Sequence, residues 1–211
     1  MKTNFNIMLV ATFLSVKPSV EEVNVHVLSG KSIQDSIVRK IPLGMQSARF
    51  KKLFRKYQKA VMIDSLTNGT EGEEIRVWNS YARSDTFQLL RIRNISSKWS
   101  MEFYTIVFKN AEDSFSILKK DVLTGIPKSG WSRFTYSIFH NGIKTLPDYS
   151  EIKGYDLPFD GGGPTVEIAN KKFYKIYSYP LPRYYSKRFP QAKKMAKLLR
   201  LLENEFGFTW M

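Results

Sequence analysis

Cysteine is absent from the 211 residues of the chain. This absence excludes disulfide bonds, thiol nucleophiles, thiolate metal sites and a lipid anchor on an N-terminal cysteine. Histidine is scarce, since His26 and His140 are the only two and lie far apart in the sequence. Two imidazoles are too few for most histidine-rich metal sites. We therefore predict no metal site, no cofactor and no assignable catalytic residue.

The N-terminal apolar run, residues 7–16, is too short to cross a bilayer, which takes about 20 residues in a helix. The run follows one lysine and precedes Lys17-Pro18. Its length and position are typical of the hydrophobic part of a signal peptide. We expect residues 1–19 to be a signal peptide and the protein to be exported, periplasmic or extracellular, with a mature chain that starts between Ser15 and Glu22. Because no small-x-small cleavage site follows the run, a buried first element of a cytoplasmic protein is the alternative.

Acidic residues are missing from two segments of the chain. Residues 171–200 hold ten Lys or Arg and seven aromatics, and residues 39–59 hold eight Lys or Arg. The whole chain has 33 basic and 19 acidic residues and a formal net charge of +14, so the rest carries 15 basic against 19 acidic residues. The positive excess is therefore local, and it predicts a basic surface for an anionic partner.

The predicted anion-binding surface takes its cations from both segments. The candidates are Arg183, Lys187, Arg188, Lys193, Lys194, Lys197 and Arg200 in the second segment, and Lys51, Lys52, Arg55 and Lys56 in the first. On the predicted C-terminal helix, Lys193, Lys194, Lys197 and Arg200 lie toward the positive end of the helix dipole, which costs about 0.3–1 kcal/mol per charge near the terminus. Stability alone would not select this order, so the cations either bind an anion or lie against acidic loops.

Aromatic residues accompany the second basic segment. About half of those in the strand before Pro180 are expected in the core, because a strand buries alternate residues. Tyr184 and Tyr185 lie outside that strand and are the candidates for stacking on a ligand. The partner of this surface is predicted to be an anionic polymer, a membrane surface or an acidic protein.

Residue spacing predicts an α+β fold with a mostly antiparallel sheet. Strands are expected at 20–28, 75–81, 86–93, 99–109, 165–170 and 172–179, and helices at 46–63, 131–141 and 190–207. The connections between residues 75 and 109 are short enough for an antiparallel meander. Pro190 and Gly207 are typical first and last residues of the C-terminal amphipathic helix, which is expected to cover one face of the sheet with one or two further helices.

The chain is expected to divide at an exposed acidic loop, residues 65–74. Residues 20–64 would form an N-terminal strand and a basic amphipathic helix whose apolar stripe includes Leu53, and residues 72–211 the main domain. Glu71, Glu73 and Glu74 are interpreted as solvated loop charges.

The order of several short motifs resembles a group of uncharacterised exported proteins of Bacteroides-type bacteria, over about residues 72–206. The motifs are Gly130-Trp131, Leu146-Pro147-Asp148, Asp160-Gly161, Val166-Glu167-Ile168, the Tyr174 to Pro180 strand and the Leu201 to Phe206 helix end. The resemblance implies an envelope or secreted location and no established activity. Many of these proteins are lipoprotein-like, but the lack of cysteine excludes a lipid anchor here.

These observations favour a non-catalytic exported protein that binds an anionic partner through one continuous basic surface. A first alternative is a ribonuclease-like hydrolase that pairs His26 or His140 with a lysine or a carboxylate. A second is a structural or protein-interaction envelope protein whose positive charge serves solubility.

Overall fold

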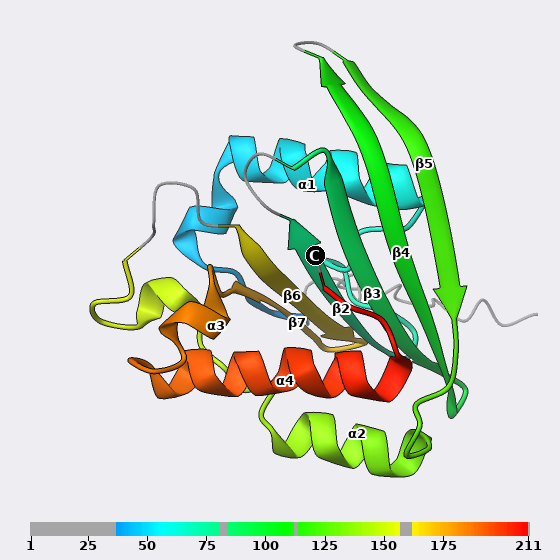
Figure 1. Ribbon diagram of the computed structural model, residues 1–211, viewed down its shortest axis with the longest axis vertical. Helices are drawn as coiled ribbons and strands as arrows, with labels where there is room; N and C mark the ends of the chain where they lie inside the picture. Colours follow the sequence, from blue (N-terminus) through cyan, green and yellow to red (C-terminus); the bar gives the residue numbers. More distant parts are fainter. Residues whose placement is uncertain (1–36, 81–83, 112–113, 157–161, 211) are drawn as a thin grey trace, which may run out of the picture. The chain divides into compact units, whose positions relative to one another are not determined.

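A seven-stranded β-sheet is the framework of the part of the chain that the structure describes (Figure 1). The computed structural model describes residues 37–80, 84–111, 114–156 and 162–210, all within one compact unit, Ser32–Met211. The order is β1-β7-β6-β2-β3-β4-β5, and every neighbouring pair is antiparallel except β1 and β7. The strands are β1 (Val38–Lys40), β2 (Glu73–Ser80), β3 (Thr86–Ile95), β4 (Lys98–Ala111), β5 (Ser114–Thr124), β6 (Gly163–Asn170) and β7 (Phe173–Ser178). The predicted α+β class is confirmed.

Tight turns set the register of the predicted meander and of the β6–β7 hairpin. β3 and β4 are joined through Ser96 and Ser97, whose φ angles of 50° and 63° are the left-handed values that a two-residue hairpin turn requires. At the β6–β7 turn, the side-chain oxygen of Asn170 accepts a hydrogen bond of 2.9 Å from the backbone N–H of Lys172. Such local side-chain bonds explain why these residue types occur at turns.

The helices are α1 (Ala48–Val61), α2 (Trp131–His140), α3 (Pro182–Tyr185) and α4 (Pro190–Phe206), with short 3₁₀ turns η2 (Leu43–Gln46) and η3 (Tyr149–Glu151). Three of the four helices, α1, α2 and α4, begin and end close to the predicted residues, and α3 was not predicted. Ser47 caps α1, because its hydroxyl accepts a 3.2 Å hydrogen bond from the N–H of Phe50. Gly207 ends α4 with a left-handed φ of 72°, as a C-terminal glycine commonly does.

Helices cover both faces of the sheet (Figure 1). On the first, called the α4 face, Val77 and its apolar strand neighbours pack against α2 and α4, whose contributions include Leu198. On the second, called the α1 face, Trp78 and its neighbours pack against α1, which contributes Val61. Successive residues of a strand point to opposite faces, which explains how Val77 and Trp78 reach different helices. The expectation that all helices pack on one face is therefore wrong.

Other expectations need smaller corrections. Leu53 was expected in the apolar stripe of α1, but it is 46% exposed. The stretch 65–74 is not wholly an exposed loop, since Leu66 is buried and Glu74 is buried within β2. Strands β1 and β5 were not predicted, and the strand expected at 20–28 lies outside the described residues. None of the helices in the described ranges has the length and apolar character that a membrane crossing needs.

Candidate functional site

The outer side of α4 forms a cationic groove with α3. Lys193, Lys197 and Arg200 are spaced three and four residues apart, so they share one side of the helix, while the buried stripe of α4 faces the sheet. Arg183 reaches the groove from α3. The groove has a volume of about 260 Å³ and is completed by Ser186 and Ala196. Part of the predicted basic surface thus converges on one hollow.

The charge of this groove is largely uncompensated. Arg183 forms an ion pair with Glu203, with 2.7 Å between Nη2 and Oε1. Among the described residues, no carboxylate forms an ion pair with Lys193, Lys197 or Arg200. These three cations have no ion-pair partner among the described residues, and Lys193 lies near the N-terminus of a 17-residue helix, so together they create a local potential that attracts an anion.

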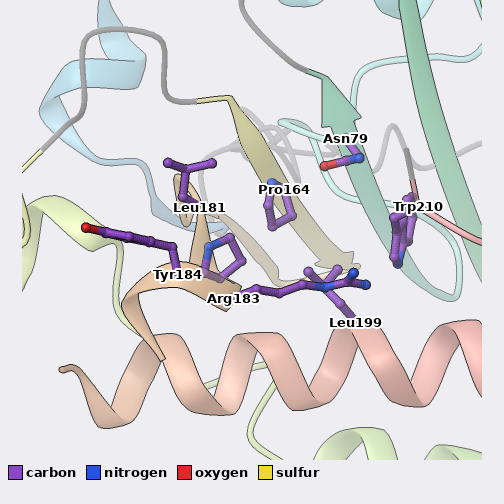
Figure 2. Close-up of a pocket in the computed structure, with 8 residues that line it drawn as sticks. Asn79, Pro164, Leu181, Arg183, Tyr184, Leu199 and Trp210 are labelled. Atoms are coloured by element: carbon purple, nitrogen blue, oxygen red, sulfur yellow. The ribbon is translucent and has the colours of Figure 1, made fainter. Parts of the chain in front are cut away.

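A second hollow, of about 300 Å³, lies on the other side of Arg183 (Figure 2). It is lined by Asn79 and Pro164 from the sheet, by α3 and α4, and by Trp210 near the C-terminus. The indole N–H of Trp210 is buried and has no hydrogen-bond partner among the described residues. Because a buried donor of this kind is costly to leave unpaired, it marks a place where a ligand acceptor would be stabilised. Arg183 therefore lies between two adjacent hollows.

The two candidate stacking residues have different surroundings. Tyr184 is 75% exposed and lines the second hollow next to Arg183 (Figure 2). Tyr185 is half-buried, packs against Tyr155 with 4.6 Å between ring centroids, and donates a hydrogen bond to the backbone oxygen of Asp156. Only Tyr184 presents an open ring to a ligand.

The remaining cations of the second segment lie outside the groove. Lys187, Arg188 and Lys194 are exposed but do not line either hollow. The guanidinium of Arg188 lies 5.1 Å from the ring centroid of Phe189, where it stacks on its own neighbour.

The first basic segment does not join this groove. Lys51, Lys52, Arg55 and Lys56 belong to α1, which covers the α1 face of the sheet, whereas the groove belongs to the opposite side. The expectation of one continuous basic surface is therefore wrong. Lys51 and Arg55 instead line a separate cavity of about 400 Å³ under α1.

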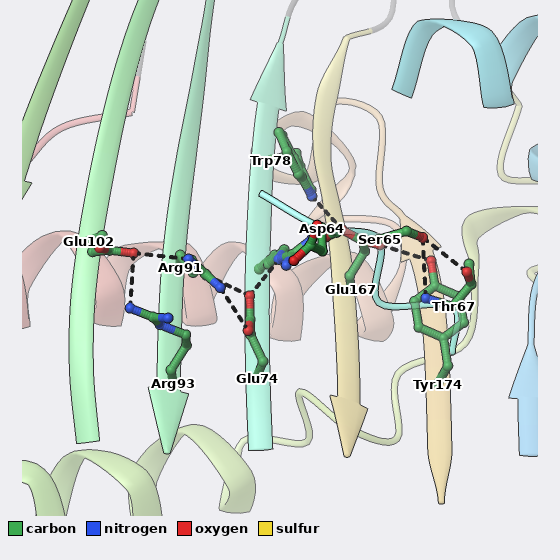
Figure 3. A network of polar contacts seen from close by, with 11 residues as sticks. Asp64, Ser65, Thr67, Glu74, Trp78, Arg91, Arg93, Glu102, Glu167 and Tyr174 are labelled. Carbon is green, nitrogen blue, oxygen red and sulfur yellow. Dashed lines mark hydrogen bonds and ion pairs between the residues drawn. The ribbon is translucent and has the colours of Figure 1, made fainter. Parts of the chain in front are cut away.

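Between these two surfaces, the α1 face of the sheet carries a strip of buried charges (Figure 3). Arg76, which is 1% exposed, donates from Nε to Glu74 Oε1 at 2.6 Å and from Nη1 to the backbone oxygen of Asp64 at 2.7 Å. Arg91 donates to both oxygens of Glu74, at 2.6 Å and 3.2 Å, and lies 3.3 Å from Glu102. Alternate residues of β2, β3 and β4 thus form a connected chain of ion pairs.

Glu167 of β6 ends this strip and is fully buried. Its two oxygens accept hydrogen bonds from the indole N–H of Trp78 at 2.8 Å and the hydroxyl of Tyr174 at 2.9 Å. Arg76 Nη1 lies 3.8 Å from Glu167 Oε2. Burial raises the pKa of Glu167 above its ordinary value, against the opposing charge of Arg76 and these hydrogen bonds.

Glu74 shows the opposite shift. Burial alone would raise the pKa of Glu74, but the hydrogen bond and charge of Arg91 and the charge of Arg76 outweigh burial and lower the pKa. Burial also raises the pKa of Tyr174, and the neighbouring carboxylate of Glu167 raises it further. These residues were not identified from the sequence. The available signal was the repetition of charged residues at alternate positions within predicted strands.

A histidine-based active site gains no support from the described residues. His140 is exposed at the end of α2 and stacks on Tyr136 with 5.6 Å between ring centroids. No described carboxylate forms an ion pair with it, so it lacks the partner that a general base needs. His26 lies outside the described residues.

The chain was also compared with known proteins. No family model matches it, and neither the curated proteins nor the solved structures contain a match.

Proposed function

We propose that this protein is a non-catalytic binding protein that holds an anionic polymer in the groove between α3 and α4. The observation that carries the proposal is the convergence of Lys193, Lys197 and Arg200 on one groove without a described carboxylate partner. An exported location is part of the proposal. N-terminal sequencing of the chain recovered from its host would test it, with a mature start expected between Ser15 and Glu22.

The spacing of the cations favours a polymer over a single small anion. A helix rises 1.5 Å per residue, so Lys193 and Arg200 lie about 10 Å apart along the axis of α4. Successive charges of a phosphate- or sulfate-bearing chain can contact such a row, and a lone phosphate cannot span it. The exposed ring of Tyr184 lines the second hollow and points away from the side chain of Arg183 (Figure 2), so it offers a flat surface outside the groove on which a base or sugar can stack.

The first test compares the groove with the overall charge of the protein. The groove variant carries Lys193→Gln, Lys197→Gln and Arg200→Gln. The matched control carries Lys128→Gln, Lys153→Gln and Lys172→Gln, three exposed lysines that line neither hollow. Both variants lose the same formal charge.

Fluorescence anisotropy with labelled oligo-dT, and in parallel with a labelled heparin oligosaccharide, measures the affinity over a series of salt concentrations. We expect the groove variant to bind about tenfold or more weakly, with a salt slope for oligo-dT that is smaller by about 2, because each lost phosphate contact releases fewer counterions. The control variant should bind oligo-dT with the same salt slope as the wild type. Equal losses in both variants would show that net charge alone causes the binding and would overturn the proposal.

A further inference from the structure

The cavity under α1 has the features of a separate ligand site. It lies between α1, the segment that precedes α1, the turn after α1, and strands β6 and β7. Its volume of about 400 Å³ is within the range of small-molecule sites. It is lined by Ile41, Met45, Phe50, Lys51, Phe54, Arg55, Gln58, Ser65, Thr67, Glu167 and Tyr174.

One wall of the cavity is apolar and aromatic. Phe50 and Phe54 are one helical turn apart on α1, and their rings stack with 5.3 Å between centroids. Phe54 also packs against Trp78, with 5.0 Å between ring centroids, which holds the wall against the sheet. Met45 and Ile41 extend this surface from the preceding segment. An apolar ligand body would be removed from water here.

The floor of the cavity carries an unused polar group. Gln58 follows Phe54 by one further turn of α1, is 7% exposed and lines the cavity. No described residue forms a hydrogen bond with its side-chain amide, which has both donors and an acceptor to offer. Glu167 and Tyr174 lie beside it but already bond to each other. The amide of Gln58 is thus the group that a polar atom of a ligand can satisfy.

The rim of the cavity is positively charged. Lys51 and Arg55 are four residues apart on α1, so they lie on the same side of the helix as the cavity wall. Both are exposed, and no described carboxylate forms an ion pair with either of them. An anionic head group placed at this rim would be stabilised by charge-assisted hydrogen bonds.

We propose that this cavity binds a small amphipathic anion, a carboxylate or sulfonate with an apolar body. The acid group contacts Lys51 and Arg55, the apolar body packs against Phe50 and Phe54, and a polar atom of the ligand bonds to Gln58. This site lies on the α1 face and is independent of the polymer groove on α4. The experiments can therefore reject ligand binding at one site without affecting the proposal for the other site.

The test uses the fluorescent sulfonate 8-anilinonaphthalene-1-sulfonate as probe with the full chain. Lys51→Gln/Arg55→Gln is expected to raise the dissociation constant about fivefold or more, because two charge-assisted contacts are lost. The matched control, Lys52→Gln/Lys59→Gln, removes the same charge from exposed positions of the same helix that do not line the cavity. Its dissociation constant should stay unchanged.

Competition identifies the ligand class. Decanoate should displace the probe, decanol should displace it more weakly, and decyltrimethylammonium should not displace it. Ser65→Phe, which places a ring at the cavity lining, should abolish probe binding while cooperative unfolding is retained. If that variant fails to fold, the rim variant and its control still decide the question.

Three outcomes would overturn the proposal. One is equal weakening in the rim variant and its control, which would indicate a general charge effect. The second is displacement by the cationic competitor as strong as that by decanoate. The third is full probe binding to a folded Ser65→Phe variant.

Discussion

The α4 face and the α1 face of the sheet are built from alternate residues of the same strands, and their chemistry differs. In β2, Ile75 and Val77 join an apolar core that continues through α2 and α4. Glu74 and Arg76 alternate with these two residues along the strand, point to the other face and form a buried ion pair. The apolar face is stabilised by packing that needs no ionised partner, whereas each buried charge of the other face is stabilised only when its partner is present.

This difference has an energetic consequence. A buried ion pair gains little over an apolar replacement of both partners, because desolvation cancels much of the Coulomb attraction. Removing one partner is different, since it leaves a charge buried without compensation. The charged strip should therefore respond to single substitutions strongly and with a dependence on pH that the apolar face lacks.

The largest effect is expected from Arg76→Met. Arg76 contacts Glu74, lies near Glu167 and donates to the backbone oxygen of Asp64, and all of these would lose a partner. We expect the free energy of unfolding to fall by about 3–5 kcal/mol, measured by urea titration.

Arg93→Met is the matched control for this prediction. Its side chain is 27% exposed and forms one longer contact, 3.6 Å, with Glu102. The expected loss is below about 1 kcal/mol. Similar losses for the two variants would mean that the buried strip has no special energetic role.

The next largest effect is expected in the pH dependence of the free energy of unfolding, to which Glu167 and Glu74 on the α1 face should contribute with opposite signs. The pKa of Glu167 is raised in the folded state, so its contribution to stability is present below about pH 4.3 and lost as pH rises through the folded pKa. The pKa of Glu74 is lowered, so its contribution is present above about pH 4.3 and lost as pH falls through the folded pKa. The two carboxylates should thus act in opposite directions.

Unfolding free energies of the wild type, Glu167→Gln and Glu74→Gln, measured from about pH 3 to about pH 8, test this prediction. Relative to Glu167→Gln, the wild type should lose stability as pH rises, by at most about 1.4 kcal/mol per pH unit. Relative to Glu74→Gln, it should lose stability as pH falls. Leu198→Ala on the α4 face should cost about 2–5 kcal/mol at every pH, because only apolar contacts are removed. Slopes of the same sign for both carboxylates would contradict the assignment.

The comparison also explains which elements the sequence could predict. Helix α4 and strands β2, β3 and β4 each bury one side, so their apolar residues recur at helical or alternate spacing. Strand β5 has exposed residues from Ser116 onward and a register shift opposite Val107 and Phe108, so regular alternation is absent. Strand β1 has three exposed residues and pairs in parallel with β7, which leaves no local pattern to detect.

The cationic groove between α3 and α4 could also be predicted only in part from the sequence. The lack of acidic residues in 171–200 indicated a basic surface, and Lys193, Lys194, Lys197 and Arg200 were expected on one helix, although Lys194 does not line the groove. The position of α1 on the other face could not be predicted, because a helix's apolar stripe does not specify which side of a sheet it covers. The sequence does not indicate the burial of Glu74 and Arg76, since charged residues are rarely buried unless they are paired, and pairing depends on register across three strands.

The smallest changes in the free energy of unfolding are expected when two buried glutamines, one on each side of the sheet, are replaced. Gln88 of β3, on the α4 face, is 3% exposed and donates to the backbone oxygen of Thr209 at 3.2 Å. Gln58 of α1 is also buried but has no hydrogen bond from its side-chain amide to a described residue. Gln88→Leu should lower the free energy of unfolding by about 1 kcal/mol, because its hydrogen bond to Thr209 is lost, and Gln58→Leu should change it by less, because no hydrogen bond to a described residue is removed. If thermal and urea unfolding instead show equal losses, the Gln58 amide already has a partner in the folded protein, and its proposed role in holding a ligand would have to be replaced by a structural one.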